Sequence, residues 1–346
     1  MDELDRVGAV YLAHLTDADL EALVHADEVP AAEAETRIRA LRRSPALLLD
    51  VLDRPSVTAS VLNLSSADPR QRFALISPFL VFAAAIHRVA ADLRGSGYVP
   101  ERTTPRLRIP VFDGPQLAGY LAQAEHRLFL AELLASFARS SSGVIVTRTP
   151  HGLRRRRWND LDLGRLVMLL DSLPEPERPP VWRRLGDLTL FLAGVYPAAI
   201  ERVFAGRLDP VRLASVTGLS APPSGSLDAA GLFEWLGAGW YRLAASRATA
   251  ETVAGAFAPA AVIAPPGSRS PALPAAGSPG SAGRPGATAT SSALSRAAGG
   301  PRSAAATTTA ALRDNADHFH QARRVLNATT DRYLFPLTTE WFTPPG

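Results

Sequence analysis

The sequence predicts a mainly α-helical protein, with a single multi-helix body, one small β-hairpin at about 144–158, a disordered linker and a C-terminal amphipathic helix. Three observations predict this class. Apolar residues recur at helical spacing over most of the first 257 residues, a β-branched run interrupts them once, and small residues dominate 258–308. We therefore divide the chain into a helical domain (1–257), a linker (258–308) and a C-terminal helix with its tail (309–346).

Composition supports a folded body of this size. The chain has 346 residues, of which 47% are hydrophobic and 20% are charged, and these proportions are typical of globular rather than disordered proteins. All 37 basic residues are arginine, because the sequence contains no lysine. General use of arginine in place of lysine makes each single arginine a weaker sign of a binding site.

Helix-start signals divide the first hundred residues. Thr16 is placed as an N-cap between two leucines, and Pro30 falls where a first helical turn begins. A further helix ends before Pro55. Beyond Pro78, apolar residues recur at helical spacing until Gly95 ends the segment.

Between Leu117 and Phe137 the apolar residues occupy two faces, which predicts one central, buried helix. His126 falls on the second of these faces. A buried imidazole can act as a general base, but no carboxylate on the same helix orients this one. We favour a histidine of the core whose hydrogen bonds are satisfied.

The stretch GVIVTRTPHGLRRRRW predicts the hairpin, with strands at Val144–Thr149 and Leu153–Trp158. Arginines on both faces of the second strand indicate an arm that protrudes or lies at an edge. Such an arm could bind nucleic acid or another anionic partner, and it could equally be a solvated edge that prevents strand pairing. The candidate binding residues are Arg148, His151, Arg154, Arg155, Arg156, Arg157 and Trp158.

Helices are predicted again at 159–173, 180–204 and 226–257. Asp160 and Asp162 have a spacing that can hold a divalent cation. Their position at a helix start favours another interpretation, in which Asn159 or Asp160 is the N-cap and Asp162 lies in the first turn.

The last hundred residues change character twice. Of the 51 residues at 258–308, 43 are Ala, Gly, Pro, Ser or Thr, which predicts a flexible linker. A stripe of apolar residues then recurs every seven positions, at Leu312, Phe319, Leu326 and Tyr333. This partner-helix stripe needs a surface to cover it, either on the helical domain, which we favour, or on a second chain.

The same C-terminal helix carries two pairs of possible metal ligands, Asp314 with His318 and Asp317 with His320. Counted from the apolar stripe, the first pair lies on the opposite side and the second on the flanks. We therefore expect a solvated face and no metal site.

The absence of lysine and cysteine from the sequence excludes several kinds of active site. Without lysine there is no P-loop ammonium, no kinase lysine and no Schiff base to pyridoxal phosphate. Without cysteine there is no thiolate nucleophile, cysteine-bound zinc, cysteine-bound iron–sulfur cluster or disulfide. The patterns G-x-S-x-G, H-E-x-x-H and G-x-G-x-x-G do not occur either. We expect no cofactor and favour a protein that is not an enzyme.

The first residues, MDELDR, are acidic and lack the pattern of a secretory signal. The longest apolar runs, at 78–86 and 188–200, are shorter than the roughly 18–20 residues that cross a bilayer. We therefore expect a cytoplasmic protein that does not insert into a membrane.

These observations favour a non-enzymatic intracellular protein that acts as a protein-binding or regulatory module. The first 60 residues carry a net charge of −6, whereas 139–157 contain six arginines and no acidic residue. A tethered amphipathic helix adds a possible docking element, so we expect a protein partner or self-association. Two alternatives remain: a nucleic-acid-binding protein that uses 148–158, and an enzyme whose active-site residues converge only in the fold.

Overall fold

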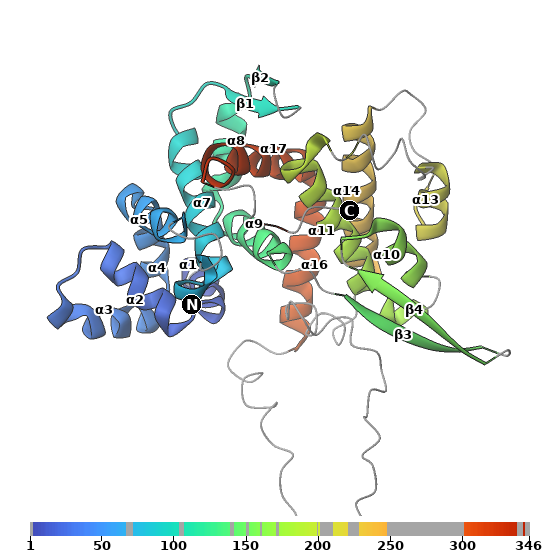
Figure 1. Cartoon of the computed structure of the whole chain (residues 1–346), viewed down its shortest axis with the longest axis horizontal. Helices are drawn as coiled ribbons and strands as arrows, with labels where there is room; N and C mark the ends of the chain where they lie inside the picture. The colour runs from blue at the N-terminus through green and yellow to red at the C-terminus, as the bar shows by residue number, and fades with distance from the viewer. Residues whose placement is uncertain are drawn as a thin grey trace, which may run out of the picture.

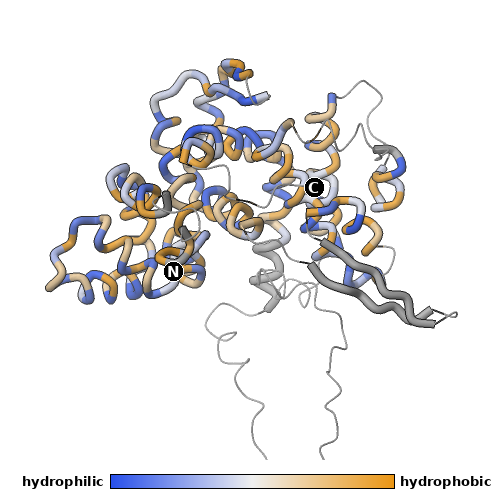
Figure 2. The backbone as a smooth tube through the Cα atoms, viewed as in Figure 1, coloured by the Kyte–Doolittle hydropathy of each residue, from blue (hydrophilic) through white to orange (hydrophobic). Residues whose placement is uncertain are grey.

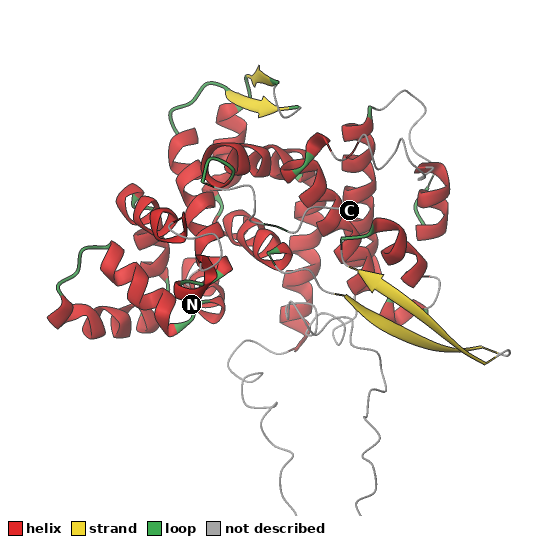
Figure 3. Cartoon of the chain, in the orientation of Figure 1, coloured by secondary structure: helices red, strands yellow, loops and turns green. Residues whose placement is uncertain are grey.

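The computed structural model describes residues 3–66, 72–103, 107–138, 142–149, 152–159, 161–170, 173–198, 200, 210–220, 228–247, 301–337 and 342. Helices dominate these residues (Figure 3), which confirms the predicted mainly α-helical class. The predicted linker lies outside the described residues as far as Gly300. Its last eight residues, 301–308, instead form the first turns of a helix.

The first half of the chain forms helices that pack around α7 and α9 (Figure 1). They are α1 (Glu3–His14), α2 (Asp17–Ala26), α3 (Ala31–Arg43), α4 (Ala46–Leu52), α5 (Pro55–Ser66), α6 (Arg72–Leu75), α7 (Pro78–Leu93), α8 (Gly114–Ala122) and α9 (Ala124–Phe137).

The second half adds α10 (Leu163–Leu170), the 3-10 turn η1 (Glu175–Glu177), α11 (Pro179–Val195), α13 (Pro210–Thr217) and α14 (Ala229–Arg247). The C-terminal segment forms α16 (Pro301–Asp317), α17 (Phe319–Thr329) and the π-helical turn η3 (Thr330–Leu334).

Local signals place the helix starts. Thr16 caps α2 in a capping box, because its hydroxyl accepts from Asp19 N at 3.2 Å while Asp19 Oδ2 accepts from Thr16 N at 2.8 Å. Ser77 caps α7, because its hydroxyl accepts from Leu80 N. Pro78 follows at the first helical position, where no N–H is needed for an intrahelical bond. The cap of α10 is Asp162, which accepts from Arg165 N at 3.0 Å. The helix therefore starts later than predicted.

The predicted single helix across α8 and α9 is wrong, because the chain breaks at Gln123, which has φ −77° and ψ 125°. Side chains of α9 replace the hydrogen bonds that a continuous helix would make. His126 Nδ1 donates to Tyr120 O at 2.7 Å, and Arg127 Nη1 donates to Leu121 O at 2.6 Å. These two bonds satisfy carbonyls that the end of α8 leaves open.

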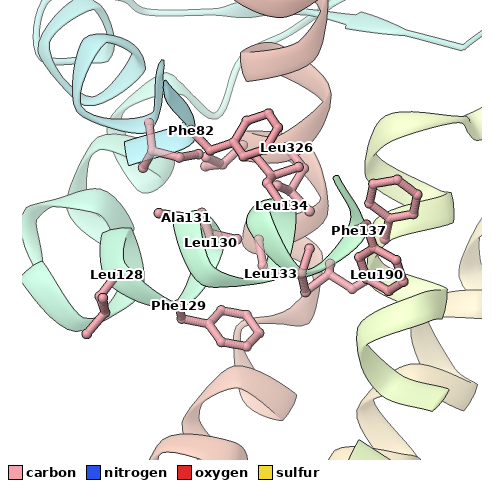
Figure 4. Close-up of a cluster of buried hydrophobic side chains, with 14 of the residues drawn as sticks. Phe82, Leu128, Phe129, Leu130, Ala131, Leu133, Leu134, Phe137, Leu190 and Leu326 are labelled. Atoms are coloured by element: carbon pink, nitrogen blue, oxygen red, sulfur yellow. The ribbon is translucent and has the colours of Figure 1, made fainter. Parts of the chain in front are cut away.

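The core is centred on α9, which contacts α1, α7, α8, α11 and α17. Leu130 and Leu134 are fully buried there, with Phe82 of α7 and Leu326 of α17 beside them (Figure 4). At the end of α9, Phe137 stacks on Phe191 of α11 with ring centroids 4.3 Å apart.

Two antiparallel hairpins leave the helical body (Figure 1). The predicted hairpin is confirmed as β3 (Ser142–Thr149) and β4 (Gly152–Asn159), with Val144 opposite Arg157 and Thr147 opposite Arg154. The second hairpin, β1 (Val99–Arg102) and β2 (Arg108–Val111), was not predicted. Prolines weaken its strand signal, but Pro100 and Pro110 face each other across the pair.

The C-terminal segment is bent rather than one straight helix, since α16 ends at Asp317 and α17 begins at Phe319. The bend lets α16 lie along α14 while α17 lies along α11 and crosses α7, α8 and α9. Glycines permit these close approaches: an added Cβ on Gly194 of α11 would lie 2.5 Å from Leu326 Cβ, and one on Gly237 of α14 would lie 2.3 Å from Phe319.

Candidate functional site

The turn end of the β1–β2 hairpin, at Arg102 and Arg108, is fixed to α17 and η3 by side-chain contacts. Asn327 is buried, and its Oδ1 accepts from Arg102 N at 2.8 Å while its Nδ2 donates to Arg102 O at 3.0 Å. The Arg102 guanidinium donates to Val195 O at 2.7 Å. On the other strand, Arg108 forms a bidentate pair with Asp331, at 2.6 and 2.7 Å.

A charged cluster beneath the same hairpin joins it to α17 and α14. Glu101 accepts from Arg323 and pairs with Arg324 at 3.2 Å, and Glu234 of α14 accepts from Arg323 Nε at 2.5 Å. Burial would lower the pKa of Arg323, but the carboxylates of Glu101 and Glu234 outweigh it and raise the pKa. Burial would likewise raise the pKa of Glu234, but hydrogen bonds from His320 and Arg323 lower it. Both partners therefore stay charged.

Four apolar residues at the two ends and in the second strand of the hairpin are exposed instead. We call Tyr98, Leu107, Ile109 and Phe112 the arm patch, and the hairpin with its flanking residues 98–103 and 107–112 the arm. The side chains of the patch are between 43% and 80% exposed, with Phe112 the most exposed. The rings of Tyr98 and Phe112 lie 6.1 Å apart. In Figure 2 the backbone of the β1–β2 hairpin, at the top of the view, includes hydrophobic positions drawn in orange.

The arm thus holds the side chains of Glu101 and Arg102 inward, whereas the four apolar residues of the patch are exposed. Water alone favours the reverse, because exposed apolar area costs about 25 cal/mol per Å² relative to burial. Exposed apolar side chains on a fixed support are typical of interaction surfaces. Here the register puts Leu107 and Ile109 on one face of the hairpin, and a ring contact joins Tyr98 to Phe112.

A second cluster joins α9 to the bend between α16 and α17. His126 is 2% exposed, stacks on Tyr120 with centroids 4.0 Å apart, and lies 2.5 Å from Asp314 Oδ2 through its Nε2. His318 Nδ1 lies 3.1 Å from Asp314 Oδ1. Burial and the Asp314 carboxylate raise the pKa of Tyr120, whose buried hydroxyl has no hydrogen-bond partner.

This cluster corrects one expectation from the sequence and adds a partner that the sequence did not indicate. The carboxylate partner of His126 exists, but it comes from residue 314 and not from the same helix. Asp314 and His318 are not on a wholly solvated face, since their side chains are only 41% and 37% exposed and contact a buried histidine. The second predicted pair separates: Asp317 pairs with Arg242, and His320 pairs with Glu234.

A third cluster lies in the core of the N-terminal half. His87 Nδ1 donates to Asp53 Oδ1 at 2.7 Å, and Tyr11 OH lies 3.1 Å from His87 Nε2. Burial lowers the pKa of His87 and raises that of Tyr11. Tyr11 and His87 are 0% and 1% exposed, so a dissolved substrate cannot contact them in this fold, and the chain of hydrogen bonds serves the core.

The residues that the sequence singled out fall into two groups. The side chains of Arg148, Arg154–Arg157 and Trp158, and the whole of His151 and Asp160, lie outside the described residues. The stripe residues Leu312, Phe319 and Leu326 are buried in the core, and Tyr333 packs beside it.

Sequence reasoning missed the arm patch and the partners of His126. The signal for the patch was present as alternating apolar residues at 107, 109 and 111, set between prolines. No local signal connects residues 126 and 314.

Comparison with known proteins gives no match: no family, no curated protein and no solved structure matches this chain. Among the described residues, no helix is both long enough and apolar enough to cross a membrane.

Proposed function

We propose that this protein is a protein-binding module whose contact surface is the arm patch. One observation carries the proposal: a hairpin whose turn end is fixed to α17 presents Tyr98, Leu107, Ile109 and Phe112 to solvent. A fixed surface loses little conformational entropy on binding, and aromatic residues are enriched at the centres of interfaces. The partner is a protein that offers an apolar surface of its own.

The experiment compares wild type with a double variant, Ile109→Ser with Phe112→Ser. A matched control is Leu75→Ser, because Leu75 is 68% exposed on α6, away from the arm. Sedimentation of the purified chain tests a second copy as partner, and quantitative co-purification from the native host tests other proteins. We expect the arm variant to lose a partner that wild type and the control both keep.

The proposal would be overturned if all three chains sedimented alike and co-purified with the same proteins in the same amounts. Circular dichroism of the three chains excludes misfolding as the cause, since the substituted side chains lie on the surface.

Nucleic-acid binding is the second candidate, favoured by the four consecutive arginines in β4. Four consecutive arginines, Arg154–Arg157, lie along one strand of a hairpin that extends from the helices (Figure 1). Arginine and a neighbouring tryptophan suit phosphate contact and base stacking. Its test is a salt titration with labelled DNA and RNA.

A further inference from the structure

The cluster around His126 contains a contact between two atoms that would both be acceptors without a further proton or a cation. Tyr120 O is a carbonyl oxygen and carries no proton, so His126 Nδ1 must donate in the 2.7 Å contact between them. In a neutral imidazole the proton on Nδ1 leaves an unshared electron pair on Nε2. That pair faces the carboxylate oxygen of Asp314 at 2.5 Å. A second proton, on Nε2 or on the carboxyl group, satisfies this contact as it stands, and a metal ion satisfies it once the two atoms move apart to the spacing of metal ligands.

Three side chains converge in the manner of a metal site. His126, Asp314 and His318 each offer one ligand atom, and these atoms lie within 4.8 Å of one another. In a tetrahedral zinc site, bond lengths of about 2.0 Å place neighbouring ligand atoms about 3.3 Å apart. The two carboxylate–imidazole separations, 2.5 and 3.1 Å, are shorter than this value, so the side chains must move slightly apart when an ion binds.

The surroundings of the cluster favour a built site over a chance contact. Tyr120 O holds the ring of His126 through its other nitrogen, as the second contact of a metal-binding histidine usually does. Asp314 lies in the last turn of α16 and His318 follows at the bend, where its Nδ1 is 3.0 Å from Asp314 O, so its Nε2 is left to bind an ion. Beside them the buried Tyr120 hydroxyl has no hydrogen-bond partner.

We propose that His126, Asp314 and His318 bind one divalent transition-metal ion, of which Zn²⁺ best suits two imidazoles and a carboxylate. Water completes the coordination. The ion joins α9 to the bend between α16 and α17, and so fastens the C-terminal helices to the body of the chain. This inference is independent of the arm patch.

The test is calorimetric titration of ZnCl₂ into the full chain, free of affinity tag and treated with a chelator. Asp314→Asn is the principal variant, because its amide can donate to the neutral Nε2 of His126 and so removes the need for a cation. His318→Ala is the second. His320→Ala is the matched control, since His320 lies on the same segment but outside the cluster.

We expect wild type and His320→Ala to bind one Zn²⁺ per chain with equal affinity, and both other variants to bind at least about tenfold more weakly. Zn²⁺ should also raise the Tm of wild type and leave that of Asp314→Asn unchanged. Circular dichroism without metal confirms that each variant folds. No Zn²⁺ binding by wild type, or unchanged binding by Asp314→Asn, would overturn the proposal and leave a proton between Nε2 and the carboxylate.

Discussion

Replacing Gly237 by alanine tests whether α14 and the C-terminal helices meet as closely as the fold requires. The new Cβ would lie 2.3 Å from Cζ of Phe319 and 2.6 Å from Oγ1 of Thr189. Neither neighbour can withdraw easily. Phe319 is 2% exposed, and the Thr189 hydroxyl donates to carbonyls of its own helix, including Gly186 O at 2.8 Å.

The expected loss follows from two opposing effects. Overpacking of a filled core costs about 1–3 kcal/mol, and contacts this short belong at the upper end. Alanine is favoured over glycine within a helix by about 1 kcal/mol. The free energy of unfolding should therefore fall by about 2 kcal/mol, as the difference of these two estimates.

Gly119→Ala is the matched control, because Gly119 is exposed on α8 and a Cβ there meets nothing within 4 Å. It should stabilise the chain by about 0.5–1 kcal/mol. Denaturant unfolding followed by circular dichroism measures both variants, and their difference of about 3 kcal/mol corresponds to a Tm difference of roughly 6–12 °C. Equal stability of the two variants would refute the close packing of α14 on Phe319.

Three further outcomes follow from the described contacts. Asn327→Leu leaves the partly buried N–H and C=O of Arg102 without their side-chain partner, so the free energy of unfolding should fall by about 1–3 kcal/mol. Hydrogen exchange at the arm should accelerate, and unchanged exchange would contradict the role given to Asn327. Burial lowers the pKa of His87, so below pH 6.5 the unfolded chain binds a proton that the folded chain does not. The free energy of unfolding should therefore fall as the pH drops below 6.5. This residue contributes a slope of at most about 1.4 kcal/mol per pH unit. The variant His87→Gln should lose that slope in urea denaturation between about pH 7 and pH 5. An unaltered slope in the variant would contradict the role given to His87. If the β3–β4 arginines contact DNA, affinity should fall with a log–log salt slope of roughly −3 to −4, and replacement of Arg154–Arg157 by alanine should abolish binding; no binding at low salt ends that alternative.

The free energy of unfolding should fall further at still lower pH, because of Asp53. Burial would raise the pKa of this carboxyl, but the hydrogen bond from His87 and the charge of Arg127 lower it below 3.8. A carboxyl group whose pKa is lower in the folded chain stabilises the fold at pH values above its unfolded pKa. This contribution is lost as the pH falls through the pKa of the folded chain.

Local patterns predicted the elements whose causes are local. Thr16 and Pro78 start helices because caps and first-turn prolines act within a few residues. The β3–β4 hairpin followed from its β-branched run and its turn. The stripe at Leu312, Phe319 and Leu326 correctly marked the side of the C-terminal segment that enters the core.

The candidate sites could not be predicted in the same way, because their causes are distant in the sequence. The break at Gln123 depends on side chains that reach back from α9 to the carbonyls of α8. The cluster at His126 needs residue 314, and the arm is held by Asn327, more than 200 positions beyond β1. Helical periodicity records which side of a helix is buried, but not which helix covers it.

The most direct test of the central claim, that the arm patch contacts a protein, is photo-crosslinking from a single position on it. A photoreactive phenylalanine analogue replaces Phe112 in the full chain within the native host, and the same analogue at Leu75 serves as control, since both side chains are well exposed. The account predicts a discrete crosslinked protein from position 112 and none from position 75. No adduct from position 112, or the same adducts from both positions, would contradict it.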